Sequence, residues 1–192
     1  GRPVGERMRD IHSLREGGTL DPDSNVLFGE GGAGAYSDGK LTTRIHRGEV
    51  EWFFRTMVDC GAPAAILYEA RPHIGTDGLV PLLANIRKLI EESGSRILFG
   101  ERVSGFIREG GRAAGVLTAG GGEYRANAVV FATGHSARDA YDLLSRERIA
   151  LEKKGFAVGV RVEHPARLID RIQYGGMADR GLLPAADYRL AF

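Results

Sequence analysis

Apolar residues between positions 79 and 90 recur every three or four residues, which is the spacing of one face of an α-helix. These residues are Leu79, Leu82, Leu83, Ile86, Leu89 and Ile90. Thr76 or Asp77 is placed to cap the start of this helix. Pro81 falls in the first turn, and Gly94 lies just past the end. The pattern predicts an amphipathic helix, and beyond it the spacing changes.

Short strand-like segments follow this helix, at residues 96–99, 103–108, 113–118 and 123–125. Glycine turns at 109–111 and 120–122 separate them, so we expect a small antiparallel meander.

Residues 128–132 (AVVFA) are continuously apolar, which is typical of a strand buried on both faces. A helix is expected next, over 137–144. Together these segments predict an α/β fold with an antiparallel excursion.

The rest of the chain adds two helices and two strands to this expectation. Residues 6–15 are compatible with a short charged helix, and the apolar residues of 50–58 recur at helical spacing. Strand character returns at 156–163 and again at 188–192. Because the chain opens without methionine and closes inside an expected strand, we expect it to be the middle of a larger protein.

Composition excludes several classes of partner. Lysine and arginine number 26 against 25 aspartates and glutamates, a net charge of +1, which disfavours nucleic acid and membrane surfaces. No apolar run approaches the roughly 20 residues that span a bilayer, and the N-terminus lacks the apolar core of a signal peptide. The single cysteine, Cys60, cannot form an internal disulfide, so we expect a cytoplasmic protein.

The 28 glycines cluster, and residues 29–34 (GEGGAG) satisfy the letters of the dinucleotide-binding motif G-x-G-x-x-G. That motif lies between a strand and a helix, whereas the turn signal at 36–39 (YSDG) follows here, so we reject the assignment. The glycines and basic side chains of the loop still suit a phosphate or a ring system. Its polar residues are Ser37, Asp38, Lys40, Thr42 and Arg44. The alternative is a surface loop without function.

Residues 134–138 (GHSAR) follow an expected strand and precede an expected helix, as the nucleophile elbow of hydrolases does. Arg138 is bulky where the elbow needs a small residue, and the acids before the later His164 lie in the following helix. A hydrolase with Ser136 as nucleophile is therefore a lesser alternative. The five histidines are scattered, so the sequence does not support a zinc site.

Four blocks of the sequence resemble a known family. They are residues 21–44 (DPDSNVLFGEGGAGAYSDGKLTTR), 71–77 (RPHIGTD), 132–139 (ATGHSARD) and 156–165 (FAVGVRVEHP). Together they resemble the uncharacterised FAD-dependent dehydrogenases of bacteria, within the two-dinucleotide-binding-domain flavoproteins. The resemblance covers nearly the whole chain.

The resemblance implies a partial FAD-binding Rossmann-like domain at 1–148, with its meander at 96–125, and the start of a second α+β substrate domain at 149–192. The first strand, the glycine fingerprint and the ribose-binding acid of the family would precede Gly1. In such flavoproteins Val103 would lie against the adenine, and 132–134 would form the turn where a strand ends against the cofactor.

The cofactor-binding residues that we expect on these grounds are Gly29, Gly31, Gly32, Gly34, Ser37, Asp38, Lys40, Thr42, Arg44, Val103, Ala132, Thr133, Gly134 and His135. FAD is the expected cofactor, NAD(P)H a candidate electron partner, and a small molecule the substrate. No catalytic residue follows from the sequence, and we expect the 192 residues alone to be inactive. The alternative from another class is a cofactor-free structural or interaction domain that self-associates through an open sheet edge.

Overall fold

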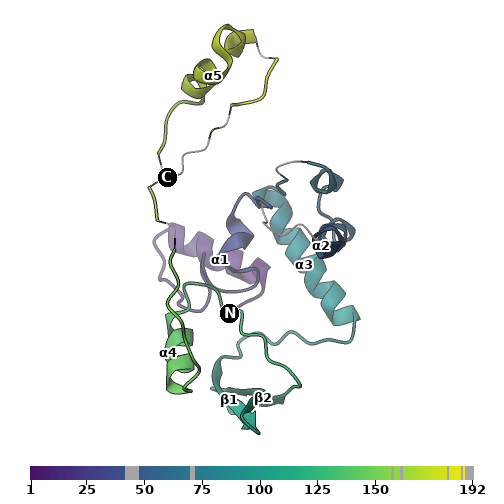
Figure 1. Cartoon of the computed structure of the whole chain (residues 1–192), viewed down its shortest axis with the longest axis vertical. Helices are drawn as coiled ribbons and strands as arrows, with labels where there is room; N and C mark the ends of the chain where they lie inside the picture. Colours follow the sequence, from purple (N-terminus) through teal and green to yellow (C-terminus); the bar gives the residue numbers. More distant parts are fainter. Residues whose placement is uncertain are drawn as a thin grey trace. The chain divides into compact units, whose positions relative to one another are not determined.

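The computed structural model describes residues 1–41, 48–69, 72–156, 158–160, 162–180, 182–186 and 188 (Figure 1). It divides into two compact units, Gly1–Leu151 and Glu152–Phe192. The described part contains both helices and a small antiparallel sheet, so the expected mixed α/β class is confirmed. No helix among the described residues is long and apolar enough to cross a membrane.

The helices of unit 1 follow the predicted pattern. They are α1 (Val4–Arg15), α2 (Gly48–Asp59), α3 (Thr76–Glu92) and α4 (Arg138–Arg146), with 3-10 helices η1 (Gly32–Tyr36) and η2 (Ala64–Leu67) between them. The four α-helices match the expected helices at 6–15, 50–58, 79–90 and 137–144 to within a few residues. Apolar periodicity located α2 and α3, because each of them packs one apolar face against the core.

The hydrophobic core of unit 1 lies where α2, η2 and α3 meet, and Figure 1 shows α2 and α3 side by side. Its buried members are Met57, Cys60, Ala62, Ile66, Ile74, Leu79 and Leu82. The side chain of Asn85 on α3 ties the two helices together, since its amide donates to the carbonyl of Cys60 at 2.8 Å.

The start of α3 differs from the expected cap. Gly75, with φ of +84°, is the N-cap residue, and neither Thr76 nor Asp77 caps the helix. The Thr76 hydroxyl instead donates to the carbonyl of Ser37 at 2.9 Å, and the Gly75 amide donates to the carbonyl of Asp38 at 3.0 Å. The side chain expected to cap the helix therefore fastens it to a distant loop. Gly94, with φ of +83°, follows the end as predicted.

The predicted meander is confirmed for three of its four segments. Strands β1 (Val103–Glu109), β2 (Arg112–Thr118) and β3 (Glu123–Arg125) pair antiparallel in the order β1-β2-β3. The ladder between β1 and β2 is irregular at two points, between Val103 and Gly105 and between Ile107 and Arg108.

Two expected strands of unit 1, at 96–99 and 128–132, are not strands in the structure. Val130 is 89% exposed, whereas the ring of Phe131 packs on that of Phe106 in β1, with centroids 5.7 Å apart. An apolar strand buried on both faces is stable only when neighbouring strands supply its hydrogen bonds. Within the described residues, the sheet comprises only β1, β2 and β3, so 128–132 has no such partner.

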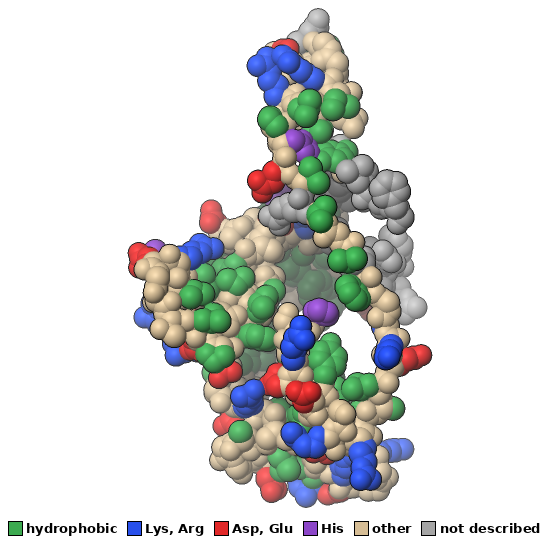
Figure 2. Space-filling view, turned by 90° about the vertical axis from the view of Figure 1, so that its left-hand side faces the viewer, with side chains coloured by type: hydrophobic (Ala, Val, Ile, Leu, Met, Phe, Trp, Pro, Cys, Tyr) green, Lys and Arg blue, Asp and Glu red, His purple; other side chains and the backbone are tan. Residues whose placement is uncertain are grey.

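Unit 2 contains α5 (Ala166–Tyr174) and η3 (Gly175–Arg180). Arg167 and Asp179 form an ion pair of 2.8 Å between these two helices. No described side chain of unit 2 is buried, and Phe156, Val158, Val160 and Val162 are each more than half exposed. Figure 2 shows hydrophobic side chains exposed on both units.

The described residues of 156–163 form no strand, for the same lack of a partner. Of the strand expected at 188–192, only Tyr188 lies within the described residues.

Candidate functional site

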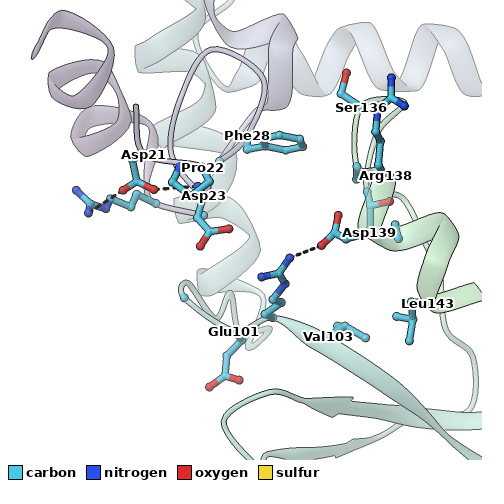
Figure 3. Close-up of a pocket in the computed structure, with 18 of the residues that line it drawn as sticks. Asp21, Pro22, Asp23, Phe28, Glu101, Val103, Ser136, Arg138, Asp139 and Leu143 are labelled. Carbon is cyan, nitrogen blue, oxygen red and sulfur yellow. Dashed lines mark hydrogen bonds and ion pairs between the residues drawn. The ribbon is translucent and has the colours of Figure 1, made fainter. Parts of the chain in front are cut away.

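A pocket of about 790 Å³ opens in unit 1, where segments distant in the sequence converge (Figure 3). One wall comes from the chain start and from the loop that contains residues 21–23 and 28–29. Another is residues 100–103, which lead into β1. The third is the segment from Phe131 through Thr133 to residues 136–143, which ends in α4. Its volume lies within the range of roughly 300–1,000 Å³ that is usual for small-molecule and cofactor sites.

Apolar side chains line much of this pocket. Phe28 reaches in from the loop, Val103 from the start of β1, and Leu143 from α4, as Figure 3 shows. Phe131 adds a second aromatic ring. Aromatic and aliphatic walls of this kind accept a flat ring system.

An ion pair joins two walls of the pocket. The Arg102 guanidinium donates to the Asp139 carboxylate at 2.5 Å, the contact drawn as a dashed line at Asp139 in Figure 3. The hydrogen bond from Arg102 lowers the pKa of the Asp139 carboxyl below its usual value, and it raises the pKa of Arg102 in turn. Arg102 and Asp139 therefore remain charged at neutral pH and connect the start of β1 to α4.

The other arginines at the pocket differ in how far acids neutralise them. Arg2 pairs with Asp10 at 2.9 Å and with Asp21 at 3.1 Å. Arg138, at the start of α4, is exposed, and the ion pairs found among the described residues do not include it. Arg138 is therefore the basic side chain here that is best able to bind an anionic group, because its charge is not shared with a described carboxylate.

The loop that supplies Phe28 and Gly29 is held from behind by buried polar groups. Asn25 closes it locally: its side-chain oxygen accepts from the amide of Leu27 at 2.9 Å, and its amide group donates to the carbonyl of Asp21 at 2.8 Å. Ser24 donates to Asp10 of α1 at 2.5 Å. The loop thus belongs to the packed part of unit 1.

Two of the clustered glycines owe their identity to close packing. Gly29 has φ of +114°, and a Cβ there would lie 2.5 Å from Cδ of Arg7. Gly31 has φ of +79°, and its Cβ would collide with the side chain of Leu83. Gly32 and Gly34 face open space. A short 3-10 helix follows rather than an α-helix, in agreement with rejecting the dinucleotide motif.

The structure brings only some of the expected cofactor residues to the pocket. Gly29, Val103 and Thr133 line it. Ala132, Gly134 and His135 adjoin Thr133 in the chain and are exposed, but they do not line the pocket. The φ of +83° at Gly134 favours glycine there by itself, since a Cβ would meet no described atom within 4 Å.

The other expected residues lie elsewhere. Gly31, Gly32 and Gly34 are in or next to η1 and do not line the pocket. Ser37, Asp38 and Lys40 belong to a segment that runs beside the start of α3, where Leu41 donates to the carbonyl of Pro72 at 2.8 Å.

Lys40 contacts Asp38 at 3.1 Å, and the hydrogen bond from Lys40 lowers the pKa of the Asp38 carboxyl. Ser37, Asp38 and Lys40 do not line the pocket. Thr42 and Arg44 fall outside the described residues.

Several pocket residues were not expected from the sequence, namely Arg2, Phe28, Arg102, Arg138 and Asp139. Phe28, Arg138 and Asp139 lie inside blocks that carry the family resemblance, which was the available signal. Arg102 had none, because a lone arginine before a strand carries no pattern.

Ser136 also lines the pocket, but the residues around it do not form the catalytic arrangement of a serine hydrolase. No hydrogen bond within the described part of the chain joins Ser136 to a histidine. His164, the only histidine that follows it in the sequence, belongs to unit 2 and lies near Tyr188, with ring centroids 5.4 Å apart. A nucleophilic serine needs a base within hydrogen-bond reach.

Comparison with known proteins gives two similarities. Residues 155–192 match the family model "FAD-dependent protein, C-terminal domain-like". Over all 192 residues, the chain is 41% identical to an uncharacterized protein of Clostridium beijerinckii. The chain spans 36% of the length of that relative. The matched residues belong to unit 2, so the similarity to FAD-dependent proteins and the pocket come from different units.

Proposed function

We propose that these 192 residues are part of an FAD-dependent oxidoreductase and that the pocket of unit 1 holds part of the FAD. The observation that carries the proposal is the match of residues 155–192 to FAD-dependent proteins. The pocket supports it independently, because its volume and its apolar walls suit a flat cofactor. In this proposal residues 1–148 contribute to an FAD-binding domain of Rossmann-like type, and 149–192 begin a substrate domain.

The residues that would hold the cofactor follow from the pocket. Val103 and Phe131 offer apolar surface to a ring, and the backbone at Gly29 and Gly100 permits close approach because no side chain intervenes. Arg138 would pair with an anionic group of the cofactor.

Bound flavin would supply the hydride chemistry, with NAD(P)H as the proposed electron partner and a small organic molecule as substrate. The protein residues would supply placement and charge. A cytoplasmic location belongs to the proposal, since Cys60 is a buried free thiol.

The test begins with the visible absorption spectrum of the protein purified with its natural termini. We expect a flavin spectrum that survives removal of free FAD by gel filtration. Arg138→Ala should weaken FAD binding by about five- to tenfold, the loss expected for one charge-assisted hydrogen bond. The matched control is Arg112→Ala, since Arg112 is exposed at the start of β2 and does not line the pocket.

Two results would contradict the proposal. A colourless protein that cannot be reconstituted with excess FAD would overturn the flavoprotein assignment. Equal affinities for the Arg138 and Arg112 variants would place FAD outside this pocket.

A second candidate, self-association without a cofactor, is favoured by one observation. Within the described residues, β1 and β3 are both edge strands, and open edges pair readily with another chain. Molar mass measured by light scattering across a range of protein concentrations separates the candidates. A constant monomer mass would remove this one.

A further inference from the structure

Among the described residues of unit 1, the most deeply buried charge belongs to Arg7 on α1, which is 0% exposed. Its guanidinium donates to four backbone carbonyls of the loop that ends in η1. Nε reaches Asn25 at 2.7 Å, and Nη1 reaches Glu30 at 2.5 Å. Nη2 reaches Val26 at 2.8 Å and Gly32 at 2.7 Å. One planar group thus gathers carbonyls from a stretch of eight residues, 25–32.

The surroundings of Arg7 reinforce this arrangement. The guanidinium lies over the ring of Tyr36, 4.8 Å from its centroid, and the Tyr36 hydroxyl donates to the carbonyl of Val4 at 3.0 Å. The carboxylate of Glu30 accepts from the amide of Val4 at 2.6 Å and lies 3.5 Å from the guanidinium of Arg87. The Glu30 carboxylate thus binds other groups, and all four hydrogen-bond acceptors of Arg7 are neutral carbonyls.

Burying a guanidinium that has no hydrogen-bonded carboxylate costs free energy, because the charge loses its hydration. Burial lowers the pKa of Arg7, and the charges of Tyr36 and Glu30 oppose that shift only in part. The four carbonyls that accept from Arg7 lie close together only when the loop 25–32 has this conformation. The arrangement therefore serves a particular loop conformation more directly than it serves general stability.

The other side of the same loop is a wall of the pocket. Phe28 and Gly29 line the pocket, and both lie between the carbonyls that Arg7 holds. Gly29 is pressed against the arginine, since a Cβ there would lie 2.5 Å from Cδ of Arg7. Figure 3 shows the ring of Phe28 directed from the loop toward the cavity.

We propose that Arg7 is a positioning residue, whose guanidinium fixes the loop 25–32 so that Phe28 and Gly29 form the cofactor-facing wall before the cofactor arrives. The inference rests on the proposed function, because the pocket is taken to hold FAD. Arg7 itself does not line the pocket, so it acts only through the loop.

The hydrophobic core does not contain Arg7, and this separation makes the inference testable. The core cluster is formed by residues between Met57 and Leu82. Losing Arg7 should therefore release the loop and leave the core assembled. If the closed loop then exists in only about a tenth of the molecules, FAD binds about tenfold more weakly, since the apparent affinity scales with the competent fraction.

The experiment compares Arg7→Ala and Arg7→Lys with Leu82→Ala in the protein with its natural termini. Leu82 is a buried core residue, so its variant lowers stability without removing any donor from the loop. The first readout is amide hydrogen exchange, which requires no FAD. The informative amides are those of Asn25 and Gly32, which donate to the carbonyls of Phe28 and Gly29 within the loop, and that of Glu30, which donates to the carbonyl of Arg2. The second readout is the dissociation constant for FAD.

Both Arg7 variants should lose exchange protection at these amides and bind FAD about tenfold more weakly, at a temperature where circular dichroism shows them folded. Lysine should not substitute for arginine, because its ammonium is not planar and cannot reach four carbonyls together. Leu82→Ala should retain loop protection and near-normal FAD affinity. Adding ethylguanidinium, which matches the atoms removed from Arg7→Ala, should restore FAD binding to that variant and leave Leu82→Ala unchanged.

The outcomes separate this inference from the function on which it rests. Wild-type protein that binds no FAD contradicts the proposed function, and retained loop protection in Arg7→Ala then contradicts the inference on its own. If wild type binds FAD and the Arg7 and Leu82 variants lose affinity equally, the function stands and the positioning role is wrong. If Arg7→Ala fails to fold while Arg7→Lys binds FAD normally, the positioning role is likewise wrong.

Discussion

Asp139 and Arg102 form an exposed ion pair across the pocket, at 2.5 Å between carboxylate and guanidinium. Both side chains are about 60% exposed, so salt screens the pair and its contribution to stability is small. The pair matters more for geometry, because it joins the start of β1 to the first turn of α4. At the scale of single residues, the pocket is thus held by charges on its rim and by Arg7 behind its wall.

The lowered pKa of Asp139 predicts how its contribution depends on pH. A carboxyl whose pKa is lower in the folded protein stabilises the fold above its unfolded pKa of about 3.9, and the effect disappears as pH falls through the folded pKa. The stability difference between wild type and Asp139→Asn should therefore be constant from about pH 7 to 5 and decrease as the pH falls below about 3.9. Urea unfolding at each pH measures it.

The control for this prediction is Arg102→Gln alone and combined with Asp139→Asn. Asp139 lies in the first turn of α4, where any carboxylate also interacts with the helix dipole. If the pair is responsible, the Asp139 substitution has a smaller effect in the absence of Arg102, and the coupling falls as salt is raised. An unchanged effect of Asp139→Asn would assign the stabilisation to the helix end.

At the scale of elements, the meander depends on one glycine. Gly115 in β2 has φ of +155°, and a Cβ there would collide with the backbone of β3 at Tyr124 and Arg125. β3 has only three residues, so it has little pairing to spare. The backbone contact leaves no flexible side chain to move aside.

We expect Gly115→Ala to lower the free energy of unfolding by about 2–3 kcal/mol, through strain and loss of β3 pairing. Gly120→Ala is the matched control, because Gly120 lies in the next turn with open space and an ordinary φ. Its effect should stay within about 0.5 kcal/mol. Chemical denaturation of both variants measures the difference, and equal values would show that β3 is not paired closely to β2 at this point.

Elements whose signal is local were predictable from the sequence. The helices α2 and α3 follow from apolar spacing, and the meander follows from glycine turns at 109–111 and 120–122. The apolar composition of 128–132 predicts a strand, but strand formation requires partners that no local pattern reveals. The prediction of Thr76 or Asp77 as the cap of α3 was wrong for a similar reason, since the Thr76 hydroxyl donates to the carbonyl of Ser37, far away in the sequence.

The site was predictable only where it coincided with the family resemblance. Thr133 and Val103 were expected and line the pocket. The sequence does not distinguish Arg7, because an arginine in a charged segment is typical of a solvated residue. Its burial depends on the carbonyls of a loop that begins eighteen residues later. Long-range backbone contacts of this kind leave no periodic trace in the sequence.

At the scale of the whole molecule, the two units differ in how they are stabilised. The described buried residues all belong to unit 1, including the core cluster of α2, η2 and α3. The described part of unit 2 has α5 and η3 with exposed apolar side chains. Burial of apolar area is the main source of folding free energy, so unit 1 should supply nearly all of it.

We therefore expect a chain of residues 1–151 to unfold with the same midpoint in urea as residues 1–192, within the error of the measurement. Thermal unfolding should give the same temperature for both chains. A midpoint that falls on removal of 152–192 would show that unit 2 buries area that stabilises unit 1. The full chain with Leu82→Ala, in which only unit 1 is altered, shows the size of shift that a genuine loss of packing produces.

Cys60 is the single cysteine of the sequence and lies in the core cluster, 6% exposed, at the end of α2. A thiol reagent in solution can reach it only when α2 separates from its neighbours. The rate of alkylation is therefore set by how often this cluster opens, so alkylation of Cys60 measures local opening of the core. Any small molecule that binds unit 1 and keeps this cluster closed would slow the alkylation of Cys60, whether or not the molecule absorbs light.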